Sequence, residues 1–502
     1  LAATTPVAVA GRFFPGARAD RLALRRQWLE HNRTYIANLL AGVREAVDGV
    51  NPDIKLGLMT GEISYSGYGF ARWADSMAGA RRVEVKWRPG GGFYTDDNPC
   101  GLLGKAHSIG RQTALLPGAL TDIQSEHENF PYQALKKCNV MFQTEIAAYI
   151  GAGCTGTALN CMGISQDPIG EYRPYFDGVK KNRRFFDKAV ATFGRSPCEG
   201  LWPAFALDHV AIHQADEGQW LTTGAWGGDM WMFNELSEIG MPMAYARAGA
   251  HVALLSGDMC LEFSEQDLLR LLSGGVLMDG GALKRLNEMG YSEFTGFTLR
   301  DRKDRDTTEV LTDDPINGGF AGWHRDCRPS FWPDPGYLLS PSAPNSRIVA
   351  ETIDFTPTNY GPSSGVFENG LGGRVAVLGY YPWKSVHSLA KTSQMKALCR
   401  WLCHDRLPAY VASYAKAALW CRRDGEGNPA ILLVNASLDA VDGMRLHVRD
   451  VAKPLTLTRM DATTERLPIN RMDPPYAVFQ LPRLAPWEAV MVGRDSRLKI
   501  VD

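Results

Sequence analysis

The stretch LTDIQSEHENFPYQALKKCNVMFQTEIAAYIGAGCTGTALNCM, residues 120–162, decides the fold. Its periodicity predicts a strand over 120–126, a helix over 132–151 and a second strand over 154–161. Two glutamates, Glu126 and Glu128, stand where the first strand is expected to end. Strands joined through a helix are expected to be parallel, so their carboxyl ends share one edge of a sheet.

The same alternation continues on both sides of this stretch. Residues 20–48 predict a long helix with one apolar stripe at spacings of three and four, formed by Trp28, Tyr35, Ile36, Leu39, Leu40, Val43 and Val47. Further strands are expected over 54–61 and 81–87, and further helices over 71–79, 101–116 and 172–194. This is about half of a (β/α)8 TIM-type barrel, which takes ~250 residues. A doubly wound sheet is the alternative, although no GxGxxG motif follows a strand here.

The pattern of apolar residues along the chain changes twice after this segment. From about residue 196, apolar runs at 201–213, 241–247 and 251–259 predict strands of a second α/β unit. After residue 415 the pattern is all strand with short turns, which predicts a small antiparallel β-sandwich. We therefore expect three domains, with the second half of the barrel in 1–195, an α/β domain in 196–414 and the sandwich in 415–502.

Composition narrows the classes of function. The chain has 502 residues, 45% hydrophobic and 22% charged, with a net charge of −1. No basic run favours a nucleic-acid partner, and no apolar run approaches the ~20 residues that span a bilayer. No signal peptide is visible, so a cytoplasmic and a periplasmic location both stay open.

Cysteine spacing predicts neither a disulfide framework nor a metal site. The ten cysteines are irregularly spaced and form no CxxC. Cys399, Cys403 and His404 are close enough to share a metal, but two more ligands are not evident nearby. We therefore expect structural thiols, no metal and no cofactor.

The position of the two glutamates indicates a chemistry. In (β/α) barrels the active site lies at the carboxyl ends of the strands. A carboxylate there is the usual nucleophile or acid/base of an enzyme that cleaves sugars. This points to Glu126 or Glu128 as a catalytic group.

The layout resembles the β-galactosidases of glycoside hydrolase family 42. LRRQWLEHNRTYIANLLAGVREAVDGVNPDIKLGLMT resembles the helix and strand after the family's fourth barrel strand. IQSEHENFPYQALKK resembles the seventh strand with its nucleophilic glutamate. LLSGGVLMDGGALKRLNEMG is similar to the trimerisation domain, which has the shape of a class I glutamine amidotransferase.

This resemblance implies a retaining, exo-acting β-glycosidase, most simply a β-galactosidase, in a homotrimer that acts on an oligosaccharide, polysaccharide or small β-glycoside. Other β-glycosides, such as mannosides or glucosides, are alternatives, as is a catalytically silent sugar-binding or scaffold protein. A hydrolase site on the second domain is disfavoured, because Cys260 in SGDMCLEF lacks the Gly-x-Cys-x-Gly turn.

The chain departs from the family at its first residues. The family's acid/base glutamate follows an asparagine at the end of strand four, and no such Asn-Glu precedes the helix at 20–48. The expectation is that this sequence begins inside the barrel; loss of the acid/base, or a partner chain that supplies it, are the alternatives.

The resemblance and the strand ends together give the candidate site residues. Glu126 is the first choice for nucleophile, and Glu128 is either the nucleophile or a group that holds sugar hydroxyls. Glu62 is a fallback acid or hydroxyl-binding group. The other candidates are aromatic side chains that stack on sugar or belong to the core, and polar ones that bind hydroxyls: Trp87, Tyr94, His127, Asn129, Asn160 and, in the second domain, Trp226.

Overall fold

The computed structural model describes residues 17–61, 69–163, 168–205, 228–303, 305–325, 336–356 and 358–494. The fold is mixed α/β with several sheets. The chain divides into two compact units. Each unit consists of three separate segments of the chain. The first unit contains Leu1–Leu29, Gly200–Ile239 and Ala250–Leu407. The second unit contains Glu30–Glu199, Gly240–Gly249 and Pro408–Asp502.

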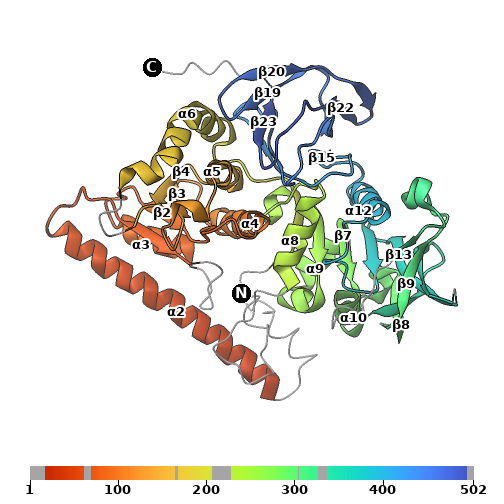
Figure 1. Cartoon of the computed structure of the whole chain (residues 1–502). Coiled ribbons are helices and arrows are strands. Elements are labelled where there is room, and N and C mark those ends of the chain that lie inside the picture. Colours follow the sequence, from red (N-terminus) through yellow and green to blue (C-terminus); the bar gives the residue numbers. More distant parts are fainter. Residues whose placement is uncertain are drawn as a thin grey trace. The chain divides into compact units, whose positions relative to one another are not determined.

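The second unit begins with a parallel four-stranded sheet in the order β1-β2-β3-β4. Its strands are β1 (Gly57–Thr60), β2 (Lys86–Pro89), β3 (Asp122–Glu128) and β4 (Gly156–Asn160). Its helices are α3 (Phe70–Ala78), α4 (Gly101–Ala114), η1 (Ala134–Lys136), α5 (Asn139–Ala152) and α6 (Ile169–Phe193) (Figure 1). The predicted alternation of strands and helices is confirmed in this segment, with β2 displaced toward the carboxyl end of the predicted run.

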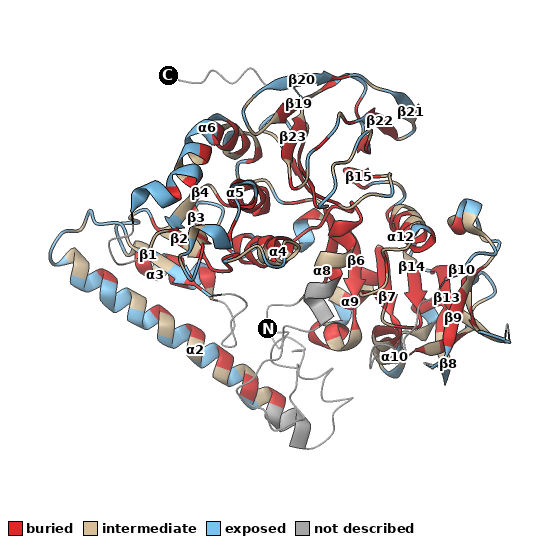
Figure 2. Cartoon of the chain, viewed as in Figure 1, coloured by how far each residue is buried: buried red, intermediate tan, exposed pale blue. Residues whose placement is uncertain are grey.

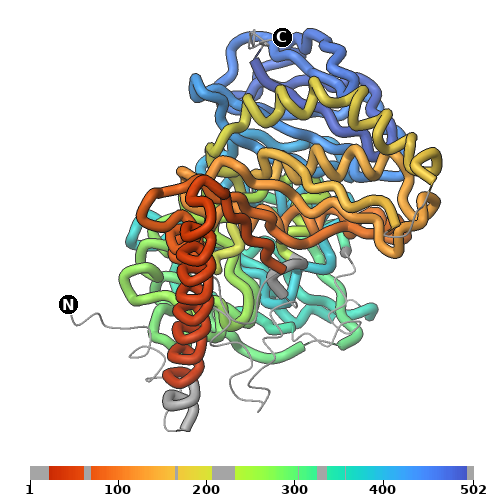
Figure 3. Tube along the Cα trace, turned by 90° about the vertical axis from the view of Figure 1, so that its left-hand side faces the viewer, coloured from red at the N-terminus to blue at the C-terminus, as the bar shows by residue number. Residues whose placement is uncertain are grey.

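The long helix α2 (Ala17–Asp48) buries a different stripe from the one predicted. Tyr35, Leu39 and Val43 of the predicted stripe are 65%, 59% and 42% exposed. The buried positions are Leu22, Arg25, Leu29, Arg33, Ala37 and Arg44. The prediction of this face was wrong because arginine stems can cover apolar surface, which a pattern of apolar residues overlooks. Figure 2 shows exposed and intermediate residues interspersed with buried ones along this helix, and Figure 3 shows its course from a second direction.

Helix α5 is buried on every side, from Met141 to Ala152 (Figure 2). An all-round apolar helix of this kind needs partners on both faces. The C-terminal strands supply the second face, since a side chain at Gly151 would meet Leu432 and Trp420. The helix ends at Gly153, whose φ of +119° is a left-handed conformation that suits glycine.

The same unit ends in an antiparallel sandwich. One sheet has the order β15-β18-β22-β21 and the other β16-β17-β23-β19-β20. The strands are β15 (Ala409–Val411), β16 (Ala417–Arg423), β17 (Pro429–Asn435), β18 (Arg445–Arg449), β19 (Leu455–Arg459), β20 (Thr464–Leu467), β21 (Arg471–Asp473), β22 (Tyr476–Gln480) and β23 (Ala489–Gly493). Alternate residues of both sheets form one buried cluster, as the predicted strand pattern requires.

The first unit is built on an eight-stranded mixed sheet in the order β10-β9-β12-β13-β14-β7-β6-β5. The four neighbours β5, β6, β7 and β14 are parallel to one another. The remaining pairs of the sheet, from β14–β13 onward, are antiparallel. Its strands are β5 (Gly200–Pro203), β6 (Ala250–Leu255), β7 (Gly275–Asp279), β9 (Thr307–Leu311), β10 (His324–Arg325), β12 (Arg347–Asp354), β13 (Asn359–Glu368) and β14 (Arg374–Leu378), with β8 (Phe297–Arg302) and β11 (Tyr337–Pro341) as a separate pair. Its helices are α8 (Gly228–Glu238), η3 (Gly257–Glu262), α9 (Glu265–Leu272), α10 (Gly280–Glu288), α11 (Ser292–Thr295), η4 (Pro315–Phe320) and α12 (Leu389–Leu402).

One predicted strand of the α/β segment is absent. Residues 241–247 are irregular and are followed by η2 (Arg247–Gly249). The side chains there are held by tertiary contacts instead of a strand ladder: a side chain at Gly110 would collide with the ring of Tyr245. This short segment belongs to the unit that contains the sandwich.

The boundaries of the two compact units differ from those of the three predicted domains. Residues 30–195 and 415–502 lie in one unit. The division into three domains stays a prediction. Across the described ranges, none of the helices has both the length and the apolar character that crossing a bilayer requires.

Candidate functional site

The pleat of β3 separates its side chains into two faces. Burial alternates along the strand, so Gln124, Glu126 and Glu128 are partly exposed whereas Ser125 and His127 are buried. A period of two places both glutamates on one face of the sheet. The structure therefore brings together the two carboxylates that the sequence singled out.

Three donors surround the carboxylate of Glu126. The backbone N–H groups of Gly91 and Gly92 lie 3.1 Å and 3.3 Å from its Oε2. Arg88 Nη2 lies 3.3 Å from its Oε1. Charge-assisted hydrogen bonds of this kind hold a carboxylate in one orientation.

The glycine loop after β2 makes this arrangement possible. Gly91 has a φ of +131°, which side chains rarely allow. A side chain at Gly92 would approach the ring of Tyr94 to 2.7 Å and Cγ of Glu126 to 3.4 Å. Glycine at both positions therefore fits the loop: Gly91 for its positive φ, and Gly92 because a side chain would displace the Tyr94 ring.

An aromatic edge borders the glutamates. Tyr94 is 40% exposed and Phe130 is 56% exposed, and their ring centres lie 6.4 Å apart in a T-shaped arrangement. Partial burial and the charges of Glu126 and Glu128 raise the pKa of Tyr94, so it is a neutral hydrogen-bonding hydroxyl at neutral pH. An exposed ring with a hydroxyl suits contact with a sugar.

A second chain of hydrogen bonds orients Glu128. The hydroxyl of Tyr132 donates to Glu128 Oε1, and Asn160 Nδ2 donates to that hydroxyl at 3.1 Å. The hydrogen bond to Glu128 raises the pKa of Tyr132, and burial adds to the shift. Asn160, at the end of β4, thus acts on Glu128 through Tyr132.

His127 and Asn129 lie on the other side of the strand. Both are fully buried. Burial, with the charge of Lys137, holds the pKa of His127 well below its ordinary value, so the ring is neutral. The prediction that these two side chains bind sugar hydroxyls is not supported, because the pleat turns them away from the face that carries Glu126.

A buried ion pair connects the two sides of the site. Lys137 Nζ lies 2.8 Å from Glu145 Oε2 and 2.7 Å from the carbonyl oxygen of Glu128. The backbone N–H of Phe93 donates to Glu145 Oε1 at 3.2 Å. Burial raises the pKa of Glu145 to about 7, against the opposing effect of Lys137. Through these contacts the ion pair connects the glycine loop after β2 to the end of β3.

Trp87 is a core residue. It is 1% exposed, packs on Phe70 with ring centres 4.7 Å apart, and donates from Nε1 to Thr60 Oγ1 at 3.3 Å. Its predicted role as a sugar platform is corrected by its place on the buried face of β2. Glu62 and Trp226 lie outside the described residues.

Arg88 and Tyr132 are site residues that the sequence did not predict. Arg88 shares a strand face with Lys86, one residue beyond the predicted end of β2. Tyr132 has a φ of +64°, in a turn whose geometry the pattern FPY does not reveal. The only sequence feature that points to them is their position, Arg88 near the end of β2 and Tyr132 in the turn after β3.

The α/β unit shows no competing nucleophile at Cys260. This thiol is fully buried in η3, and burial raises its pKa far above the ordinary range. The described cysteines are all free thiols. Within the part of the chain that the structure describes, no three His, Cys, Asp or Glu side chains gather as a metal ion would require.

No protein-family model matches the sequence, and no curated protein does. Among solved structures, α-L-fucosidase isoenzyme 2 from Paenibacillus thiaminolyticus is similar, with 11% identity over 84% of this chain and 70% of that chain and a TM-score of 0.55. A rhamnosidase from Novosphingobium sp. PP1Y aligns with 12% identity over 84% of this chain and 39% of that chain, with a TM-score of 0.39.

The first of these similarities concerns the fold. A TM-score of 0.55 over most of both chains shows that the mixed α/β architecture is shared with the fucosidase. The rhamnosidase similarity is too weak to support an argument.

Proposed function

We propose that this protein is a glycoside hydrolase that removes a terminal sugar, with Glu126 as the carboxylate that attacks the anomeric carbon. The observation that carries the proposal is the setting of Glu126, at the end of a parallel strand, with three donors fixing its carboxylate. The fold shared with a fucosidase supports it.

The chemistry follows from the two-carboxylate scheme. The Glu126 oxygen forms a bond to the anomeric carbon while the bond from that carbon to the leaving oxygen breaks. The scheme needs a carboxylic acid ~5–5.5 Å away, which would donate a proton to the leaving oxygen and, as carboxylate, would later take one from the attacking water. Glu62, outside the described residues, is the fallback candidate for this acid. Glu128 holds sugar hydroxyls in this proposal, and Tyr94 and Phe130 form the wall on which the ring lies.

The finer features of the proposal rest on the resemblance to glycoside hydrolase family 42. They are a (β/α)8 barrel, retention of configuration, a homotrimer and a preference for β-galactosides, with β-mannosides and β-glucosides as the nearest alternatives. The shared fold adds α-L-fucosides as a second candidate substrate class. These substrates differ in a few hydroxyl contacts, which an assay separates directly.

Turnover of a panel of nitrophenyl glycosides tests the function. The panel contains the β-D-galactoside, β-D-mannoside, β-D-glucoside and α-L-fucoside, assayed with the full chain and with Glu126→Gln. We expect one glycoside to be preferred and kcat to fall by at least about 10³-fold in the variant, since loss of the nucleophile removes the covalent step.

The matched control is Glu128→Gln, which removes the same charge two residues along the same strand face. We expect it to raise KM with a smaller loss of kcat than Glu126→Gln. No turnover of any glycoside by the full chain would contradict the enzyme proposal and would favour a silent sugar-binding protein. Equal activity of Glu126→Gln and the unmodified protein would refute the assignment of Glu126.

A further inference from the structure

A cavity of about 180 Å³ lies at the carboxyl-terminal end of α4. It is lined by the end of α4, the segments 195–198 and 245–248, and Arg422 of β16, all of which belong to one compact unit. One water takes ~30 Å³, so the space accommodates a polyatomic ion. It lies away from Glu126, because α4 and α5 run back from the carboxyl edge of the sheet to its amino edge.

Two arginines face this cavity without a carboxylate partner. Arg195 Nη2 donates to the carbonyl oxygen of Thr113 at 3.3 Å, and Arg422 Nε donates to that of Gly151 at 2.9 Å. Arg422 Nη1 donates to the carbonyl oxygen of Ser196. Arg195 Nε is buried and has no hydrogen-bond partner. In the described ranges, neither guanidinium forms an ion pair with an acidic side chain.

The charge around the two guanidinium groups does not balance. Burial lowers the pKa of Arg195, and the charge of Arg422 lowers it further, which shows that the two groups repel each other. The carbonyl ends of two helices offset about one positive charge, at ~0.5 charge each. About one positive charge is left in a partly buried place.

The neighbouring titratable side chains do not supply the missing negative charge. The carboxylate of Glu199, whose charge acts on Cys198, is paired with Arg423 at 2.8 Å. Burial raises the pKa of the Cys154 thiol to about 12, and it also raises the pKa of Cys198. Burial raises the pKa of Tyr245 well above its ordinary value. All three groups are neutral at physiological pH.

We propose that this cavity, between Arg195 and Arg422, binds the oxyanion of a phosphate or sulfate group. Guanidinium groups donate in pairs to such oxygens, and both Arg195 and Arg422 line the cavity. Gly153 preserves the space for the second guanidinium, since a side chain there would lie 2.9 Å from Arg422 Nη2. Because Arg422 belongs to the sandwich and Arg195 follows α6, a bound anion links the sandwich to the helices of the same unit.

Isothermal titration of the full chain with inorganic phosphate, in a chloride buffer of constant ionic strength, tests the proposal. We expect saturable binding of one phosphate per chain. Arg195→Gln is expected to raise Kd at least tenfold, and Arg195→Lys less, because lysine keeps the charge but loses the paired donors. Absence of saturable heat with the unmodified protein would overturn the proposal, as would an unchanged Kd in Arg195→Gln.

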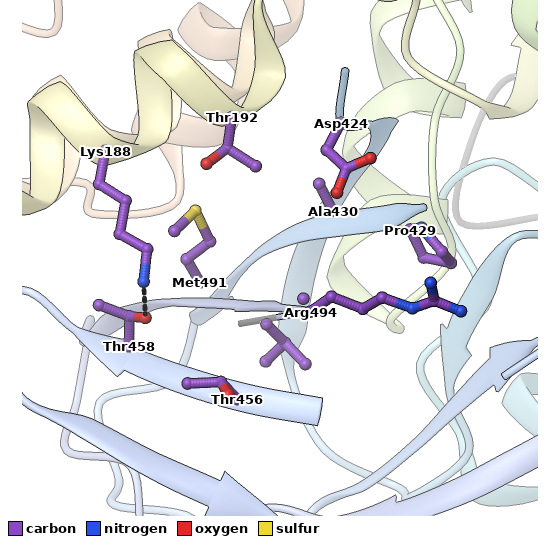
Figure 4. A pocket seen from close by; sticks show the side chains of 11 residues that line it. Lys188, Thr192, Asp424, Pro429, Ala430, Thr456, Thr458, Met491 and Arg494 are labelled. Atoms are coloured by element: carbon purple, nitrogen blue, oxygen red, sulfur yellow. Dashed lines mark hydrogen bonds between the residues drawn. The ribbon is translucent and has the colours of Figure 1, made fainter. Parts of the chain in front are cut away.

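Lys188→Gln is the matched control for net charge. Lys188 lines a second hollow of the same unit, donates to Thr458 Oγ1 at 3.0 Å, and faces a volume of only about 10 Å³ (Figure 4). We expect its removal to leave Kd within twofold. A loss equal to that of Arg195→Gln would show that phosphate is attracted by overall charge, which contradicts a built site.

Two further titrations identify the source of the oxyanion. Sulfate is expected to compete with phosphate in the same cavity. Methyl phosphate that binds within threefold of inorganic phosphate supports a phosphate ester as the natural ligand, whereas methyl phosphate that does not bind supports a free inorganic ion. Binding of both by Arg195→Gln with unchanged Kd contradicts either form.

Discussion

At the scale of single residues, the site depends on glycines as much as on glutamates. The carboxylate of Glu126 is held by backbone N–H groups that only a glycine loop brings near. The ring of Tyr94 then covers the loop, close to the place where a side chain of Gly92 would lie. The geometry of the carboxylate and the position of the aromatic wall are therefore coupled.

A Gly92→Ala substitution tests this coupling. Its Cβ would approach the Tyr94 ring to 2.7 Å, so the ring must move and the contacts of Glu126 must loosen. We expect kcat/KM for the preferred glycoside to fall about tenfold, equivalent to ~1.4 kcal/mol of transition-state stabilisation, with little change in Tm. Gly118→Ala is the control, since nothing lies within 4 Å of a side chain there. Equal kcat/KM in both variants would contradict the coupling.

Among the helices, His387 connects α8 to the segment before α12 through contacts with two glutamates. His387 Nδ1 lies 3.0 Å from Glu235 Oε2, and its Nε2 lies 3.3 Å from Glu238 Oε2. The two glutamates are three residues apart on α8 and so share a face. Burial opposes the charged ring, but the two nearby glutamate carboxylates outweigh it and raise the pKa of His387 to about 9.

This contact predicts a pH dependence of stability. Because the pKa is raised on folding, the contribution is fully present below pH ~6.5 and is lost as pH rises through about 9. The side chain is 38% exposed, so screening reduces the effect to on the order of 1 kcal/mol. Urea unfolding of the full chain and of His387→Gln at pH 6 and pH 9.5 measures it. The stability difference between the two proteins should shrink at the higher pH; a difference independent of pH would contradict the role of His387.

Strands β2 and β3 illustrate what the sequence could and could not predict. The period of two in β3 was enough to place Glu126 and Glu128 on one face. Arg88, however, lies 38 residues earlier along the chain, and its meeting with Glu126 depends on the pairing of β2 with β3. Trp87 was the last residue of a strand that was predicted to end two residues early, so its side chain was expected at the strand end instead of in the buried core.

At the scale of the whole molecule, element types were predictable whereas long-range packing was not. The helices and strands of the barrel-like segment and of the sandwich follow their own periodicities. Residues 241–247 do not, because their conformation depends on Gly110 and other residues far away in the sequence. The exposed stripe of α2 shows the same limit, since an apolar pattern does not by itself reveal which face finds a partner.

The proposed homotrimer is the prediction that belongs to this scale. Light scattering of the full chain should give three times the chain mass of 55.3 kDa. We expect this mass to persist on dilution into the micromolar range, as a stable interface requires. A clean monomer would contradict the trimer while leaving the assignment of Glu126 intact.

The proposed mechanism requires Glu126 to form a covalent bond to the sugar. The most direct test is to incubate the full chain with the 2-deoxy-2-fluoroglycosyl fluoride of the preferred sugar, then digest it and map the adduct by mass spectrometry. We expect one fluorosugar on Glu126, and none in Glu126→Gln. An adduct on Glu128 or on any other residue of the unmodified protein would contradict it.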